Sequence, residues 1–118
     1  MTSDSDVPFR NFLRDRIDTV PQEVVDATIR LWDRLQKNAP GIPLPVSMAN
    51  KNDGGSLSMT WKTNEVTLSV EIFGTEKCEW FFRDHNKNTY GGVDTAVDDG
   101  FPDTSDFREI MDHVCVCQ

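Results

Sequence analysis

Apolar and polar positions follow two different periods along this chain, and together they predict helices near both ends with strands between them. Between residues 20 and 37 an apolar stripe recurs every three or four positions, at Val20, Val24, Ala27, Leu31 and Leu35. The stretch Thr19-Val20-Pro21-Gln22 before it has the form of a capping box, with its proline in the first turn. "NAPG" follows the last apolar position, so we expect a helix over residues 20–37.

Shorter stretches with the same period predict two further helices. Near the start, one helical face is formed by Phe9, Phe12, Leu13, Arg16 and Ile17, with Asp6 as a candidate cap. Near the end, a helix at about 104–114 is predicted by the stripe Phe107, Ile110, Met111 and Val114, with Asp103 as its candidate cap. Residues 1–6 are polar and acidic, and we expect them to be disordered.

Beyond residue 41 the period changes from 3.6 to 2, which is typical of strands with one buried face. Alternation is seen in residues 42–48, 56–61, 66–72 and 78–82, separated by the turn-like segments "NKNDGG", "KTNE" and "GTEK". The pattern predicts an antiparallel meander of three or four strands. Pro43 and Pro45 cannot donate to a ladder, so they confine the first strand to an edge.

These elements together predict an α+β fold, in which helices cover the apolar face of the meander. The length of 118 residues matches a single domain over 1–118. Within it, residues 84–103 lack clear periodicity and are expected to form a long acidic connection.

The charge of the chain is concentrated near its end. The net charge is −8, and residues 91–118 hold seven acidic residues against one base, Arg108, for a net −6. Such a surface repels phosphate, which disfavours nucleic-acid or anionic-membrane binding and favours a basic protein partner. The candidate contacts are Asp94, Asp98, Asp99, Asp103, Asp106, Glu109 and Asp112. A solvated connector is the simpler interpretation of the same acidic stretch.

One aromatic residue belongs to the same hypothesis. Phe81 shares the polar face of its predicted strand with Glu79 and Arg83, and an exposed aromatic ring can anchor a partner. The alternative is a contact of Phe81 with the N-terminal helix or with the long connection.

The sequence motifs for metal binding and for nucleophilic catalysis are weaker than the signals for an acidic binding surface. An EF-hand frame with Gly100 as its sixth residue puts Thr95 first and Val97 third, which fails the pattern. His113, Cys115 and Cys117 can supply three zinc ligands, with Cys78 as a fourth, but C-x-C lies outside the usual spacing. We favour a frayed terminus with free thiols and expect no cofactor. A nucleophilic pair of Cys78 with His85 has no support from spacing.

Targeting signals are not evident in the sequence. The start "MTSDSDVPFR" has no apolar core, and no apolar run approaches membrane-spanning length. We therefore expect a cytoplasmic location. The three cysteines do not form a disulfide framework.

Two resemblances bear on the fold. The order helix, three strands, helix resembles the double-stranded-RNA-binding domain, but "PDTSDFRE" stands where that family needs a basic helix start. Residues 40–73, with a Pro-containing segment, "DGG" and a Trp-ended strand, resemble small bacterial and mobile-element proteins. This second resemblance implies a bacterial or phage-type accessory protein and brings no catalytic residues.

The sequence therefore predicts a small acidic, non-enzymatic binding protein of a bacterial, plasmid or phage system. Antitoxin-like, immunity-like and anti-defence roles all fit a protein that docks on a basic partner. One alternative is a small-molecule or metal-binding domain, including one with hydrolytic activity, that uses the His85 loop or the His113–Cys117 tail. Another is self-association.

Overall fold

The computed structural model describes residues 6–15, 20–39, 41–51, 55–74 and 76–116. It confirms the α+β class and contains a five-stranded antiparallel sheet rather than three or four strands. The helices are α1 (Asp6–Arg14), α2 (Gln22–Asn38) and α3 (Ser105–Val116), with a short 3₁₀ helix, η3 (Val97–Asp99). The strands are β1 (Ser47–Lys51), β2 (Ser56–Lys62), β3 (Val66–Ile72), β4 (Lys77–Asp84) and β5 (Thr89–Ala96).

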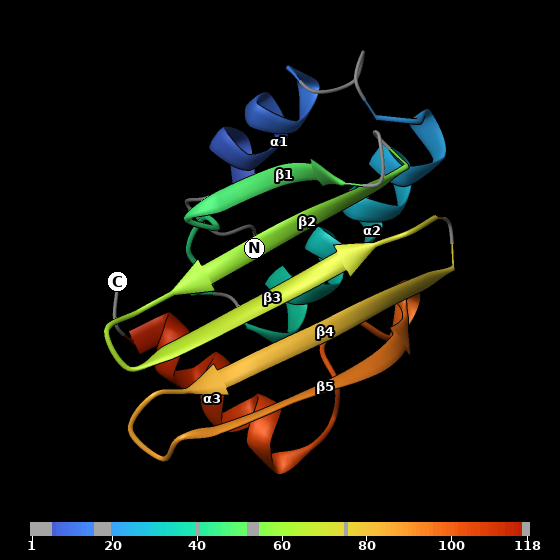
Figure 1. Ribbon diagram of the computed structural model, residues 1–118. Coiled ribbons are helices and arrows are strands. Elements are labelled where there is room, and N and C mark those ends of the chain that lie inside the picture. The colour runs from blue at the N-terminus through green and yellow to red at the C-terminus, as the bar shows by residue number, and fades with distance from the viewer. Residues whose placement is uncertain (1–5, 16–19, 40, 52–54, 75, 117–118) are drawn as a thin grey trace.

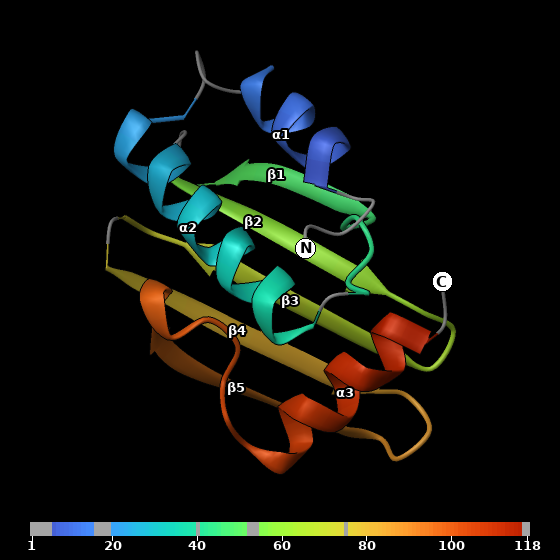
Figure 2. The ribbon, with the colours of Figure 1, turned by 180° about the vertical axis from the view of Figure 1, so that it is seen from behind.

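The sheet is a simple meander in which each strand pairs with the next, in the order β1-β2-β3-β4-β5 (Figure 1). The view from behind shows α2 and α3 lying across one face of this sheet, with α1 beside α2 at the β1 end (Figure 2). No helix of the described ranges covers the opposite face. We refer to the two sides as the helix face and the open face.

The predicted connection over residues 84–103 is wrong in its central part, because residues 89–96 form β5. Pairing with β4 places Gly91 opposite Phe82 and Gly92 opposite Phe81. The sequence of β5 lacks a regular apolar alternation because two of its positions are glycines, over which the aromatic rings of β4 lie. Its structure therefore depends on side chains of another strand, which no local pattern reveals.

We expect Gly91→Ala to lower the free energy of unfolding by about 1–2 kcal/mol through overpacking. A Cβ atom at residue 91 would lie 2.7 Å from the Phe82 ring, which itself packs edge-on against Phe107 with a centroid separation of 4.8 Å. Gly74→Ala is the matched control, since a Cβ there meets no atom within 4 Å. Urea titration of both variants measures the difference. Equal stabilities would contradict the close approach of Phe82 to β5.

The core lies between the sheet and the helices and contains the residues that the two periods predicted. The apolar stripe of α2 is buried, and so are the inward positions of β2, β3 and β4. Trp80 lies at the centre, stacked 6.5 Å from Trp61 and meeting Phe101 edge-on at 5.1 Å. At the β1 end, Phe9 of α1 stacks on Trp32 of α2 with ring centroids 4.0 Å apart. This contact attaches the first helix to the core.

The helix ends differ from the prediction in detail. Thr19 lies outside the described residues, and α2 begins at Gln22, whose amide donates to Asp26 rather than completing a capping box. Asp103 does not cap α3. Thr104 does so, accepting a hydrogen bond from the Phe107 N–H through its hydroxyl. Of the earlier predicted stretches, residues 1–5, 16 and 17 also lie outside the described residues.

The first strand lies at an edge, as its prolines predicted, but it begins only at Ser47. Pro43 and Pro45 precede it in an extended segment. This segment is held to β2 by two hydrogen bonds, from the Val46 N–H to the Thr60 carbonyl at 2.7 Å and from the Trp61 indole to the Pro43 carbonyl at 2.9 Å.

Candidate binding groove between α2 and α3

The structure places the predicted partner-binding residues on two different faces. Phe81 and Asp94 lie on the open face, because the residues next to them in β4 and β5 point into the core. The others lie in η3, in α3 or in the segment between them, on the helix face: Asp98, Asp99, Asp103, Asp106, Glu109 and Asp112. A single acidic surface that includes all of them is therefore not formed.

On the open face, Phe81 is 43% exposed and its ring lies against Gly92 of β5. The contact of Phe81 with residues 84–103 is confirmed by its position against Gly92, whereas its role as an anchor for a partner stays a prediction. Tyr90, 82% exposed, lies on the same face. The paired positions Glu71, Glu79 and Asp94 form a row beside Phe81 across three strands.

On the helix face, three of the six carboxylates form ion pairs within the chain. Asp98 contacts Arg30 of α2 at 3.0 Å, and Asp103 contacts Arg108 at 2.7 Å. Glu109 contacts Lys87 of the β4–β5 turn at 2.7 Å, and this contact raises the pKa of the Lys87 ammonium. Asp99, Asp106 and Asp112 make no ion pair with any residue that the structure describes.

The acidic residues of α3 follow one another along its exposed side. Asp106, Glu109 and Asp112 are spaced by three positions, so each is a neighbour of the next on the helix surface. The buried stripe of the same helix points to the sheet: Phe107, Ile110, Met111 and Val114. We call Asp106, Glu109 and Asp112 the acidic ridge.

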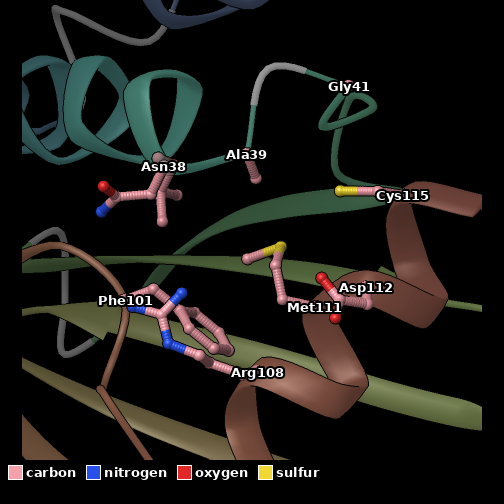
Figure 3. A pocket seen from close by; sticks show the side chains of 9 residues that line it. Asn38, Ala39, Gly41, Phe101, Arg108, Met111, Asp112 and Cys115 are labelled. Carbon is pink, nitrogen blue, oxygen red and sulfur yellow. The ribbon is translucent and has the colours of Figure 1, made fainter.

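Beside this ridge, a groove of about 250 Å³ runs between the C-terminal end of α2 and the side of α3 (Figure 3). Its lining combines apolar and polar side chains: Leu35, Asn38, Ala39, Gly41, Phe101, Arg108, Met111, Asp112 and Cys115. Figure 3 shows Met111 and Asp112 projecting from α3 toward the end of α2. Concave sites of this composition are the usual places for ligands.

The charges around the groove are unequal. Arg108 is already neutralised, since its Nε donates to the Asp103 carboxylate. Asp112 adds a negative charge that has no ion-pair partner among the described residues. The C-terminal end of α2 also borders the groove through Asn38 and Ala39, and the terminal carbonyl groups of a helix carry partial negative charge. The groove is therefore suited to a cation.

Cys115 is half-buried at the edge of the groove and remains a neutral thiol at neutral pH. Burial raises the pKa of Cys115, and the nearby Asp112 carboxylate raises it further. A protonated thiol is a poor nucleophile and a poor metal ligand.

The described residues do not bring the candidate zinc ligands together. His113 lies 3.0 Å from the Glu65 carboxylate in the β2–β3 turn, whereas Cys115 lines the groove next to α2. Cys117 lies outside the described residues. Within the described ranges, no group of three or more His, Cys, Asp or Glu side chains is placed to hold a metal ion.

The hypothetical pair of Cys78 and His85 is not formed. The Cys78 sulfur lies 3.2 Å from the Thr95 hydroxyl, and burial raises the pKa of this thiol. The His85 ring lies 3.0 Å from the Thr67 hydroxyl. The two side chains therefore have different partners and show no nucleophile–base contact.

Comparison with known proteins identifies no relative: no family model, no curated protein and no solved structure matches the chain. No helix in the described part of the chain has the length and apolar character needed to cross a lipid bilayer.

Sequence reasoning missed the groove. One wall comes from the end of α2, and the other comes from Phe101 and α3, which follow 60 or more residues later in the chain. The sequence predicts Leu35 and Met111 as core positions and offers Asp112 and Cys115 as candidates for a partner and for zinc, but no pattern places these residues together. The one local signal was "NAPG", which marks a helix end but not what lies beside it.

Proposed function

We propose that this protein is a non-enzymatic binding protein of a bacterial, plasmid or phage system, which docks on a basic protein through the helix face. The observation that carries the proposal is the acidic ridge of α3 together with exposed Asp99. Antitoxin-like, immunity-like and anti-defence proteins are the kinds of molecule that bind partners in this way. The proposal places the protein in the cytoplasm.

The structure supports this proposal for fewer carboxylates than the sequence suggested. Asp98, Asp103 and Glu109 already have basic partners within the chain, so each would add less to binding than a free carboxylate. Asp99, Asp106 and Asp112 remain to attract an incoming cation. Because these groups are exposed, their main effect is on the association rate and on its salt dependence.

Capture of a partner from native host lysate at low and high salt, followed by mass spectrometry, tests the proposal. We expect one basic protein that is retained at low salt and released at high salt. The association rate with this captured partner at low salt should then fall about 10-fold or more in a triple variant with Asp99→Asn, Asp106→Asn and Glu109→Gln. All three residues are exposed, so the variant should fold normally.

The matched control removes three exposed acidic groups elsewhere, with Asp15→Asn, Glu23→Gln and Glu76→Gln. Both triple variants change the net charge equally. A difference between their association rates therefore shows an effect of the α3 surface rather than of the total charge. Equal association rates for both triple variants, or a rate that does not change with salt, would count against docking through the helix face.

The groove favours a second candidate from another class, a small-molecule-binding domain. Its mixed lining and concave shape are the observations in support. A hydrolytic or metal-dependent activity has less support, since the residues considered for it do not converge within the described ranges.

A further inference from the structure

We infer that the groove between α2 and α3 receives one arginine or lysine side chain of the basic partner. The aliphatic stem of that side chain would lie on Phe101 and Met111, and its charged head would contact Asp112. This inference rests on the proposed function, and it names the residue class that would anchor the partner.

The apolar part of the groove matches the stem of such a side chain. Phe101 and Met111 are nearly buried and present only an edge to the groove, whereas Leu35 in the same lining has no exposed surface. Arginine and lysine characteristically bury their methylene stems along apolar surface while the charged end stays near water. A purely apolar side chain would leave Asp112 and Asn38 without a partner.

The polar part of the groove favours a positively charged ligand. Asp112 lies at the groove, and the C-terminal end of α2 adds the partial negative charge of its last carbonyl groups. The single base in the lining, Arg108, is ion-paired with Asp103, which reduces its repulsion of a second cation.

The size of the groove agrees with a single side chain. Pockets for drug-sized ligands usually enclose about 300–1,000 Å³, and this groove encloses about 250 Å³. It is therefore small for a cofactor or a nucleotide. Its position beside the acidic ridge also means that a partner drawn to Asp106 and Glu109 would present its basic side chains at the groove.

The first test uses a fragment of the expected ligand and needs no partner. Amide shifts in ¹H–¹⁵N NMR spectra are followed during titration with N-acetyl-arginine amide, and N-acetyl-citrulline amide serves as the neutral isostere. We expect weak, saturable shifts at Ala39, Phe101 and Met111 with the arginine probe and none with the citrulline probe. Asp112→Asn should weaken binding about 10-fold, whereas Asp106→Asn, with the same charge change, should weaken it less than about 2-fold.

Absence of saturable shifts at these residues would overturn the inference. So would equal binding of the two probes, or equal effects of Asp112→Asn and Asp106→Asn. Each variant is first shown to keep the spectrum of the folded protein, so that a loss of binding reports on the groove and not on unfolding.

The second test uses the captured partner and distinguishes the inference from the proposed function. Ala39→Leu fills the groove without changing charge, and we expect about 10-fold weaker binding of the partner, as for Asp112→Asn. If the triple variant of Asp99, Asp106 and Glu109 weakens binding but these two do not, the inference fails and the proposed function stands. If the triple variant has no effect while the arginine probe still binds, the partner is not held by the helix face, and the inference fails in its statement that the groove receives a side chain of that partner.

Discussion

Replacing Trp80 by alanine is expected to lower the free energy of unfolding by about 3–5 kcal/mol. Trp80 has no exposed surface and lies between Trp61 and Phe101, at centroid distances of 6.5 and 5.1 Å. Its removal leaves a large cavity at the centre of the core, where the sheet meets the segment that leads to α3. Because small domains are stable by only about 5–15 kcal/mol, this loss leaves the variant marginally folded or unfolded.

Urea denaturation followed by far-UV circular dichroism measures this effect, and Trp80→Phe is the matched control. The indole N–H of Trp80 is buried and reaches no oxygen or nitrogen acceptor among the described residues; the Cys78 thiol beside it is only a weak acceptor. Phenylalanine keeps most of the ring contacts and removes this unsatisfied donor, so its two effects partly offset each other. We expect a loss of about 1 kcal/mol for Trp80→Phe. Similar losses for the two variants would show that the residue is not packed as described.

The same pair of variants relates the core to the groove. Phe101 lines the groove and rests edge-on against both Trp80 and Phe107, at 5.1 and 5.5 Å. Loss of Trp80 removes the support on one side of this ring. Trp80→Phe should therefore retain binding of the arginine probe, while any folded fraction of Trp80→Ala should bind it more weakly.

The elements with a strong period were predictable from the sequence. The stripe of α2 and the alternation in β2, β3 and β4 each repeat over at least five residues, and each element buries the face that its pattern indicates. The stripe of α3 gave its position to within two residues at its C-terminal end. Burial of one face imposes the apolar periodicity on the sequence and also fixes the element in the structure. The periodicity therefore identifies the element.

The fifth strand could not be predicted, because it has no apolar face of regular period. "TYGGVDTA" contains two glycines and one aspartate, which are signals for turns, and its strand conformation is supported by pairing with β4. The rings of Phe81 and Phe82 lie against those glycines, but the sequence does not show which segment they reach. Non-local packing here outweighs the local preference.

The charge of the last quarter was predictable, whereas its arrangement was not. Sequence counting found the excess of carboxylates, but Arg30 and Lys87, which neutralise Asp98 and Glu109, lie 68 and 22 residues away. The strand alternation of β5 turns Asp94 to the face opposite α3. The groove arises in the same way, from the approach of α2 to the segment after η3, and one residue of that segment lies directly against α2.

That residue is Gly100, and we expect Gly100→Val to lower the free energy of unfolding by about 2–4 kcal/mol. Its φ of 73° and ψ of −128° fall in a region that residues with a side chain rarely adopt. A Cβ atom there would also lie 3.1 Å from the Cβ of Arg34 and 3.3 Å from the side-chain nitrogen of Asn38. Backbone strain and overpacking against α2 therefore act together.

Chemical denaturation of Gly100→Val beside Gly74→Val measures this effect, because residue 74 has no positive φ and its Cβ would meet no atom within 4 Å. A second readout is specific to the groove: since Phe101 follows Gly100 directly, a displaced segment should weaken binding of the arginine probe even where the variant remains folded. Equal stability of the two valine variants would contradict the close contact of this segment with α2. A stable Gly100→Val that binds the probe normally would show that the groove does not depend on this contact.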